Sequence, residues 1–229
     1  MIKLITRLEE RESYDVNYIK IAAGVKAYGL SRPFLTVWQT GDTLICRTDG
    51  YITVCGEDFD PQEVRNFLSV IGAKGIICSV DAADKLGFPY AEYKVMKSTL
   101  GTAAAADFSP KTDEVYDILS LGADGDITLP PRDAFMADLS HRVRHGTALA
   151  CTFKGTACVV PYITDCAGLI CGVSAGNARG GGFAGICVAA AVKKVGKPCF
   201  VICKDSIANF YKKYGFCECG RNAEIIFNK

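Results

Sequence analysis

The segment of this sequence best suited to chemistry is residues 177–194, which read NARGGGFAGICVAAAVKK. Three consecutive glycines follow an apolar run at residues 168–174 and lead into small apolar residues that suit a packed helix. A glycine-rich turn between a strand and a helix leaves several backbone N–H groups directed at one point, next to the positive end of the helix dipole. Glycine lets an anion approach the backbone, and Arg179 adds a charge-assisted contact. The segment therefore predicts a site for a phosphate group.

Two phosphate-binding patterns overlap in this segment. Gly180-x-Gly182-x-x-Gly185 matches the dinucleotide fingerprint GxGxxG, and Asp205 follows about 20 residues later at the end of a predicted strand. However, only residues 206–229 come after Asp205, too few for the remaining strand–helix–strand units of a dinucleotide-binding domain. The strands before the loop also read as a hairpin-linked meander. The second pattern, RxxGxA, is therefore favoured, and a nucleotide-binding oxidoreductase is the less favoured alternative.

A metal site is the other chemistry to consider. His141 and His145 lie four residues apart and would share a helix face, but no Glu follows the first His as in HExxH and no third ligand is evident. The arginines between them favour an exposed helix end, whose cations suit the C-terminal dipole. The sequence therefore predicts no bound metal.

The chain contains twelve cysteines but no Cys-x-x-Cys pair. It is too long to need disulfides for stability, and a free cysteine behaves as a small hydrophobic residue. Reduced, buried thiols are therefore expected. Most of them fall in apolar, strand-like runs: Cys46, Cys78, Cys158, Cys171, Cys199 and Cys203.

The elements that must position the loop occur twice in the same order: a helix, three β-rich runs, a helix, a strand, a short helix and a strand. Asp60 and Pro61 mark the start of one of these helices, and Gly72 marks its end. Residues 72–81 and 196–205 have equal length, both contain Ile-Cys, and each precedes a short helix ending in Gly-Phe. These features predict an internal duplication with a period of about 120 residues.

Residues 101–114, GTAAAADFSPKTDE, are small, polar and unpatterned. They are the predicted boundary between a first domain, residues 1–105, and a second domain, residues 106–229. Helices alternating with hairpin-linked strands predict an α/β (α+β) fold with a mixed, mostly antiparallel sheet flanked by helices.

The two halves differ at the turn between the third β run and the next helix. The first half has only GEDFD, residues 56–60, whereas the second has SAGNARGGGFAG, residues 174–185. Because three acids stand in the first turn, where an anion would have to bind, the phosphate site is expected in the second half. The first half is expected to form one wall of the substrate cleft. Trp38 and the aromatics of residues 88–93 are candidates to face it, with core packing as their favoured role.

Composition limits the partners. Hydrophobic residues make up 49% of the chain, charged residues 22%, and the net charge is +1 without a block of five like charges. This pattern argues against a nucleic-acid partner. No apolar run approaches the roughly 18 residues that span a bilayer, so no membrane partner is expected. The N-terminus becomes polar within nine residues, unlike a signal peptide, and a cytoplasmic protein is expected.

The RxxGxA loop, Arg179-x-x-Gly182-x-Ala184, resembles that of the GNAT superfamily of acyl-CoA-dependent N-acyltransferases. The helix and strand after the loop are followed by NFYKKYGF, residues 209–216, which is similar to the tyrosine-containing end of that core. The resemblance covers roughly residues 112–229, and the first half looks like a degenerate copy without the loop or a matching tyrosine. It implies an acyl-CoA N-acyltransferase fold in tandem, with acetyl-CoA as co-substrate.

The resemblance also implies roles for individual residues. In that family the loop amides hold the coenzyme A pyrophosphate, and an amide of the preceding strand, here that of Val173, faces the thioester carbonyl. The tyrosine four residues before the Gly-Phe pair, here Tyr211, protonates the departing thiolate. A strand N–H suits the charge that builds on the carbonyl oxygen, and a phenol has a pKa near that of a thiolate. The implied pyrophosphate-binding residues are Arg179, Gly180, Gly181, Gly182, Phe183, Ala184 and Gly185.

Three features depart from the family pattern. Lys204 stands where an Asn often contacts the coenzyme, and the Pro often found between strand and loop is absent. No Glu or Asp occurs in residues 168–174, where a general base is common. Asp165 and a water chain are both open as the base. Core packing is the alternative role for Tyr211.

We therefore expect an N-acetyltransferase that moves an acetyl group from acetyl-CoA to a small-molecule amine by direct attack. The alternative is a non-catalytic coenzyme A-binding or sensor protein, which the missing base favours. The sequence leaves the acceptor, the acyl chain preference and the oligomeric state open, a homodimer included.

Overall fold

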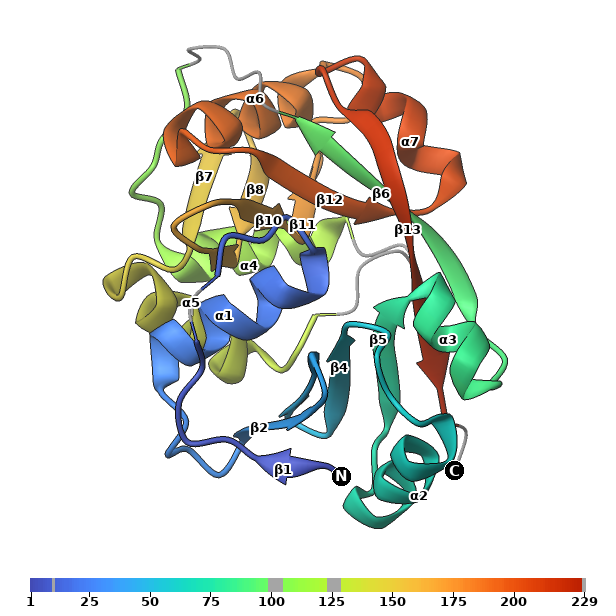
Figure 1. Ribbon diagram of the computed structural model, residues 1–229. Coiled ribbons are helices and arrows are strands. Elements are labelled where there is room, and N and C mark those ends of the chain that lie inside the picture. The colour runs from blue at the N-terminus through green and yellow to red at the C-terminus, as the bar shows by residue number, and fades with distance from the viewer. Residues whose placement is uncertain (10, 99–104, 123–128, 228–229) are drawn as a thin grey trace.

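The computed structural model describes residues 1–9, 11–98, 105–122 and 129–227. Their strands form one ten-stranded sheet and a second sheet of three strands, with helices packed around both (Figure 1). The first half contains β1 (Lys3–Leu4), α1 (Val16–Tyr28), β2 (Leu35–Thr40), β3 (Thr43–Thr48), β4 (Tyr51–Cys55), α2 (Pro61–Ile71), β5 (Gly75–Ser79), α3 (Val80–Leu86) and β6 (Ala91–Ser98). The second half contains α4 (Thr112–Leu121), α5 (Arg132–Arg144), β7 (Leu149–Phe153), β8 (Thr156–Val160), β9 (Tyr162–Ile163), β10 (Gly168–Ile170), β11 (Gly172–Ser174), α6 (Phe183–Val195), β12 (Cys199–Cys203), α7 (Asp205–Lys212) and β13 (Cys217–Ile226).

The large sheet has the strand order β1-β2-β3-β4-β5-β13-β6-β12-β10-β9. Only two of its pairs are parallel, β4 with β5 and β10 with β12, and all the others are antiparallel. The three-stranded sheet, β11-β8-β7, is wholly antiparallel. The predicted mixed, mostly antiparallel sheet flanked by helices is therefore confirmed.

The two parallel pairs reveal the repeat. Tyr51 of β4 lies opposite Gly75 of β5, and three residues of each strand are paired. Gly168 of β10 lies opposite Cys199 of β12, again with three residues paired. In both halves a helix connects the two parallel strands, as a parallel pair requires. The halves thus repeat the same strand–helix–strand unit.

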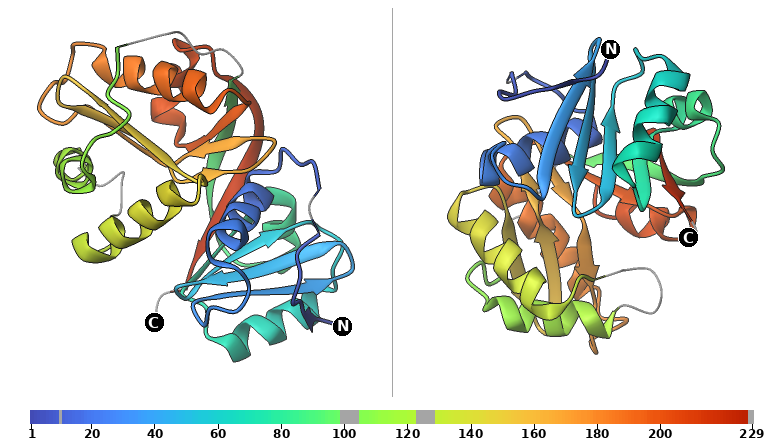
Figure 2. Two further views of the ribbon diagram at one scale, coloured as in Figure 1. Left: turned by 90° about the vertical axis from the view of Figure 1, so that its left-hand side faces the viewer. Right: turned by 90° about the horizontal axis from the view of Figure 1, so that it is seen from below.

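The last strand of each half is exchanged with the other half. β13 inserts between β5 and β6, and β6 in turn pairs with β12 of the second half. These two long strands run side by side between the halves and pass through the middle of the sheet (Figure 2). The predicted segments 1–105 and 106–229 are therefore joined by the hydrogen bonds of one continuous sheet.

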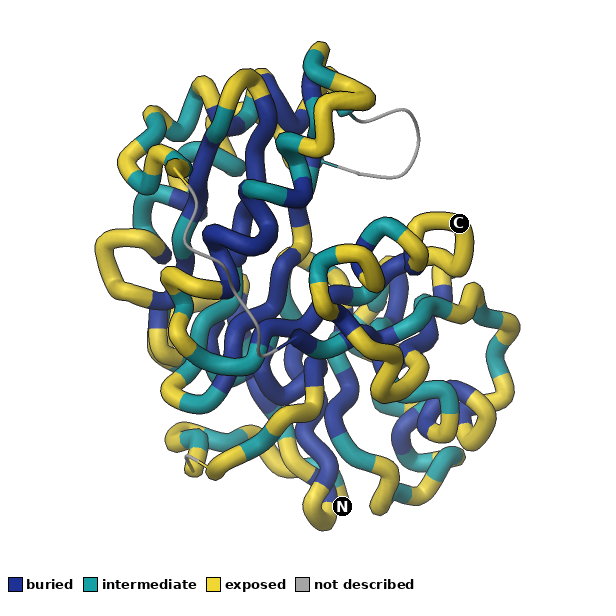
Figure 3. The backbone as a smooth tube through the Cα atoms, turned by 90° about the horizontal axis from the view of Figure 1, so that it is seen from above, coloured by how far each residue is buried: buried dark blue, intermediate teal, exposed yellow. Residues whose placement is uncertain are grey.

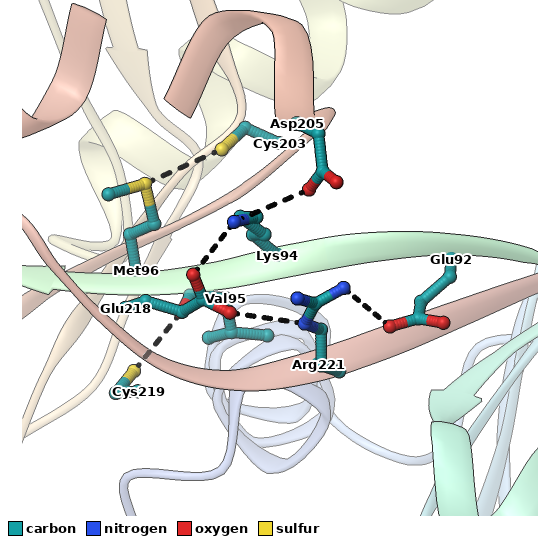
Figure 4. A network of polar contacts seen from close by, with 9 residues as sticks. All are labelled: Glu92, Lys94, Val95, Met96, Cys203, Asp205, Glu218, Cys219 and Arg221. Atoms are coloured by element: carbon teal, nitrogen blue, oxygen red, sulfur yellow. Dashed lines mark hydrogen bonds and ion pairs between the residues drawn. The ribbon is translucent and has the colours of Figure 1, made fainter. Parts of the chain in front are cut away.

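Charged side chains accompany the exchanged strands (Figure 4). Lys94 of β6 lies 2.9 Å from Glu218 of β13 and 3.6 Å from Asp205. Arg221 of β13 lies 2.7 Å from Glu92 of β6 and 3.1 Å from Glu218. Partly exposed ion pairs contribute little each, about 0–1 kcal/mol. They favour this register, while burial of the apolar side chains supplies most of the stabilisation.

The helix signals predicted the element boundaries well. α2 begins after Asp60, whose side chain accepts a hydrogen bond from the Glu63 N–H, with Pro61 in its first position. It ends at Gly72, which has the left-handed conformation at φ +67° that terminates many helices. The prediction of an N-cap, a first-turn proline and a glycine stop is confirmed.

The end of α5 is less exposed than predicted. Arg142 is buried, with its Nε 2.9 Å from both carboxylate oxygens of Asp138 and its guanidinium carbon 5.1 Å from the centre of the Tyr28 ring. The His141 ring stacks on Tyr28 at 4.4 Å, whereas Val143, Arg144 and His145 are exposed. The prediction of a solvated helix end was wrong for Arg142, because this turn packs against α1.

All twelve cysteines are free thiols. Cys46, Cys78, Cys158, Cys199 and Cys203 are buried, as predicted. Cys171 is exposed, so its predicted burial was wrong. The physical reason is its position between β10 and β11, where the chain leaves one sheet for the other. Buried residues follow the strands of the sheets, whereas exposed residues gather in the connections (Figure 3).

Candidate functional site

The site begins where one strand divides between two sheets. β10 pairs in parallel with β12 in the large sheet, and β11 pairs with β8 in the small one. Cys171 stands between them, and its N–H donates to the Val159 carbonyl oxygen at 3.2 Å. Val173, the predicted oxyanion residue, is the middle residue of β11, directly after this division. β10–β11 and β12 therefore diverge beyond Ile170.

The chain that leaves β11 is fixed to its surroundings before the glycines begin. The Ser174 hydroxyl donates to the Ile118 carbonyl oxygen of α4 at 2.8 Å and accepts from the Gly176 N–H at 3.0 Å. Gly176 has φ +49°, and a Cβ there would lie 2.5 Å from the Gly155 carbonyl oxygen. This close backbone contact requires glycine and sets the direction in which the loop starts.

The loop ends at an uncapped helix N-terminus. Gly182 is the N-cap of α6, has φ +70°, and provides no side-chain hydrogen bond to the first turn. Gly180 also has a positive φ, +86°, in space where a Cβ would meet nothing within 4 Å. The first turn of α6 contains no acidic residue. No side chain therefore caps its first N–H groups, which is the arrangement that an anion site at a helix N-terminus requires.

Two further contacts shape the start of α6. A Cβ on Gly185 would lie 1.7 Å from Cζ of Tyr214, so the tyrosine ring packs directly on the helix backbone. The Tyr214 hydroxyl donates to the Gly182 carbonyl oxygen at 3.4 Å. Position 185 thus requires glycine because the Tyr214 ring packs on it, whereas positions 180 and 182 favour glycine because the loop has a positive φ there.

The structure adds a cation that sequence reasoning missed. Lys154, in the β7–β8 turn, has its Nζ 5.0 Å from the centre of the Phe183 ring, and Phe183 is the first residue of α6. Phe183 also packs edge-on against Phe153 at 5.7 Å. The turn sequence Phe-Lys-Gly gave no indication of this proximity, because it depends on how β7 and β8 pack against α6. The ammonium group of Lys154 therefore lies beside the end of the glycine loop.

Tyr211 lies on α7 and is only 6% exposed. Its ring packs against Phe210 at 5.0 Å and Phe216 at 5.5 Å. Burial raises the pKa of the Tyr211 phenol well above its usual range, with smaller contributions from nearby thiols. Those thiols are Cys158, Cys171 and Cys203, from β8, the strand division and β12. The tyrosine therefore lies close to the place where the two sheets diverge, and it keeps its proton at neutral pH.

A pocket of about 430 Å³ opens at the same place. Ile170, Cys171 and Cys203 line it from the divided strand and from β12. α1, β5 and β6 of the first half supply other walls, and β13 supplies one from the exchanged strand. Tyr93 of β6 is among the lining residues, whereas Trp38 packs against Phe67 in the core of the first half, the role that the sequence favoured for it.

The remaining sequence candidates lie elsewhere or have other partners. Asp165, one of the bases left open, is exposed and forms an ion pair with Lys26 at 2.9 Å, which lowers the pKa of its carboxyl. It lines a separate pocket with Lys26. Lys204 is the N-cap residue of α7 and lines the pocket at the divided strand. Asp205, the acid of the dinucleotide pattern, pairs with Lys94.

Within the described ranges, no cluster of three or more His, Cys, Asp or Glu side chains is arranged to hold a metal ion. Among the same residues, no helix has the length and apolar character needed to cross a membrane.

No protein-family model matches the chain, and no curated protein matches it. The chain is similar to the structure of a GCN5-related N-acetyltransferase from Kribbella flavida, with a TM-score of 0.62 and 13% identity over 95% of this chain and 97% of that one. It is similar to an acetyltransferase from the GNAT family from Colwellia psychrerythraea, with a TM-score of 0.56 and 17% identity over 100% of both chains. A tandem GNAT protein from the clavulanic acid biosynthesis pathway has a TM-score of 0.55 and 8% identity over 100% of this chain and 99% of that one.

These similarities define the class of fold. The chain has the acyl-CoA N-acyltransferase fold of GNAT proteins, and the match to a tandem GNAT protein extends over both halves. The predicted fold is therefore confirmed.

Proposed function

We propose that the protein is an acyl-CoA-dependent N-acetyltransferase that transfers an acetyl group from acetyl-CoA to an amine by direct attack. The observation that carries this proposal is the uncapped N-terminus of α6, reached through a glycine loop from the strand that divides between two sheets. The acceptor is proposed to be a small-molecule amine and the setting cytoplasmic. Neither a nucleic acid nor a membrane is part of the proposal.

The loop residues suit a pyrophosphate. Backbone N–H groups from Arg179 to Gly185 offer donors with no competing carboxylate in the first turn of α6. Lys154 places a cation beside the first residue of α6, and Arg179 belongs to the loop itself. A diphosphate here would satisfy the helix N–H groups that no side chain caps. Acetyl-CoA, which carries a pyrophosphate, is therefore the proposed co-substrate.

The chemistry is assigned to the divided strand and to α7. Bound along β11, the acyl group would present its carbonyl oxygen to the Val173 N–H, which stabilises the charge that develops during attack. Tyr211 would give its proton to the departing thiolate. Burial raises the pKa of the Tyr211 phenol, so the hydroxyl still carries its proton when the thiolate departs, although the same shift makes it a weaker acid than an exposed tyrosine.

A non-catalytic coenzyme A-binding or sensor protein is the second candidate. It is favoured by the lack of a carboxylate in residues 168–174, the run that contains β10 and β11. Both candidates bind acetyl-CoA, but only the enzyme releases free coenzyme A when amines are added. Thiol release measured across a panel of small amines separates them.

Calorimetric titration with acetyl-CoA tests the proposal most directly, and α6 offers a matched pair of variants. Gly182 and Gly196 cap its two ends with φ +70° and +68°, and neither would bring a Cβ within 3.4 Å of a neighbour. Gly182→Glu should abolish micromolar binding, because it places a carboxylate in the anion site. Gly196→Glu carries the same backbone strain and charge and should bind like the unaltered protein.

Absence of acetyl-CoA binding by the unaltered protein would overturn the proposal. Binding of NAD in its place would favour the oxidoreductase alternative. If both glycine variants lost acetyl-CoA affinity equally, the loss would be due to strain in α6. The loop would then not be the acetyl-CoA site.

A further inference from the structure

The pocket at the divided strand contains an amino group without a partner. Lys20 lies on α1, in the first half, and is half-buried in the pocket wall. Within the described part of the chain, its Nζ forms no hydrogen bond or ion pair. Half-buried ammonium groups usually have a partner, so an unpartnered one in a pocket needs an explanation.

The surroundings of Lys20 favour its neutral form. Burial lowers the pKa of the Lys20 amine below its ordinary value, although Cys171 and Glu224 oppose this shift. The other titratable groups facing the pocket are Tyr93, Cys203 and Lys204. Glu224 accepts a hydrogen bond from the Tyr93 hydroxyl at 2.9 Å, which holds its carboxylate in place. The pocket thus combines a hydrogen-bonded carboxylate with an amine whose pKa burial lowers below that of an ordinary lysine.

Lys20 is also close to the proposed site of acyl transfer. Cys171 lines the same pocket as Lys20 and lies near enough to Tyr211 to contribute to the raised pKa of its phenol. Cys171 is solvent-accessible and lines the pocket, and desolvation raises the pKa of its thiol to about 11. Lys20 and Tyr211 therefore approach the divided strand from the first and the second half.

We propose that Lys20 is the general base of the reaction and takes a proton from the ammonium group of the acceptor in this pocket. The proposal rests on the proposed acetyl transfer. It assigns the base to the first half, although the acyl-CoA loop belongs to the second. Glu224 attracts the cationic acceptor into the pocket, and its hydrogen bond to Tyr93 keeps it oriented.

The protons balance as follows. The acceptor R–NH₃⁺ gives one proton to the neutral Lys20 amine and becomes a nucleophile. Its nitrogen forms the amide bond to the acetyl carbon while the carbon–sulfur bond breaks. The thiolate receives the Tyr211 proton, and the second nitrogen proton restores the phenol. Lys20 then releases its proton to solvent, so one proton is produced for each amide formed.

Substitution of Lys20 by arginine separates a base from a fixed positive charge. Arginine keeps the charge but does not lose its proton in proteins. Both Lys20→Arg and Lys20→Met should lower kcat by at least about 100-fold, the contribution typical of a general base. Acetyl-CoA affinity should stay unchanged. Lys26→Arg and Lys26→Met, on the exposed face of the same helix, are the matched controls and should keep full activity.

A Lys20→Arg variant with normal kcat would overturn the proposal, whether or not its KM changed. Competitive labelling with acetic anhydride across pH gives a measure that is independent of turnover. Lys20 should become reactive at a lower pH than Lys26, and equal midpoints would also overturn the proposal. If the unaltered protein binds no acetyl-CoA and acetylates no amine, the proposed function itself has failed. A Lys20→Arg variant with normal activity would instead refute only the proposal that Lys20 is the general base.

Discussion

The helices α2 and α6 occupy equivalent places in the two halves, yet their N-termini are treated in opposite ways. Each follows a strand of a parallel pair and leads to the other strand of that pair. In α2 the Asp60 carboxylate accepts from the Glu63 N–H at 2.8 Å. In α6 the N-cap is Gly182, which supplies no such acceptor. The first half closes its helix with its own carboxylate, and the second leaves the same N–H groups open.

The number of residues between the paired strands shows that the two halves differ in the length of the turn before the helix. Tyr51 pairs with Gly75, 24 positions later, whereas Gly168 pairs with Cys199, 31 positions later. The seven extra positions match the greater length of SAGNARGGGFAG over GEDFD. The short turn is also held by its acids, since Glu57 accepts from the Ser79 hydroxyl at 3.0 Å. A longer turn, with glycine in place of acid, distinguishes the proposed anion site of α6 from the capped N-terminus of α2.

The first half, which lacks the glycine loop, nevertheless forms part of the pocket. β6 completes the sheet on the side of β12, and α1 contacts β9 and β10 of the second half. Lys20 and Tyr93 line the pocket from these elements. Loss of the loop in the first half is therefore compatible with retention of its fold, because the walls of the pocket depend on it.

The two halves also differ in their short helices, α3 and α7. A substitution in α7 is expected to lower kcat more than any other change predicted below. Four residues before the Gly-Phe pair, the first half has buried Ala83 and the second has Tyr211. Tyr211→Phe removes only the hydroxyl and should lower kcat by about 10²–10⁴-fold with little change in acetyl-CoA affinity. Steady-state kinetics and calorimetry measure the two quantities.

The control for Tyr211 comes from the first half. The Tyr90 hydroxyl, just after α3, donates to Asp84 at 2.8 Å, and Tyr90→Phe should leave kcat unchanged. If Tyr211→Phe keeps normal kcat and lowers only the free energy of unfolding, Tyr211 is a core residue like Ala83. The two short helices would then differ in packing alone.

The next effect concerns the charge beside the loop. Lys154→Ala should weaken acetyl-CoA binding roughly tenfold, equivalent to about 1.4 kcal/mol, and make the affinity less dependent on salt. Lys193→Ala removes an exposed lysine from the other end of α6 and should change neither quantity. Titrations at two salt concentrations provide the test. Equal weakening by both variants would mean that Lys154 acts only through net charge.

Local signals were sufficient to predict the order of elements and the contrast between the two turns. β6 is the strand expected after the short helix of the first half, and α2 has its predicted N-cap and C-terminal glycine. These features depend on residues close together in the chain, so propensity and capping describe them. The glycines of the α6 loop were found for the same reason.

The strand exchange and the pocket could not be predicted in this way. Nothing within residues 91–98 states whether that strand pairs with its own half, because its partners β12 and β13 lie more than 100 residues away. The sequence placed Cys171 within a buried strand. In the structure it lies between β10, which belongs to the large sheet, and β11, which belongs to the small sheet. No local signal marks Lys20 in the sequence, because the packing of α1 against the second half places it in the pocket.

The smallest expected effect tests whether the closed helix end serves structure alone. Asp60→Ala removes the cap of α2 and should lower the free energy of unfolding by about 1 kcal/mol. Asp81→Ala, in the first turn of α3 but not its cap, should change it by less than about 0.5 kcal/mol. Neither variant should alter acetyl-CoA affinity, since the first half lacks the loop that would admit a diphosphate. A second acetyl-CoA site in Asp60→Ala, detected as a changed stoichiometry, would mean that the carboxylate alone had been blocking an otherwise complete anion site. The comparison would then rest on one side chain, and the seven additional residues of the second half would need another explanation.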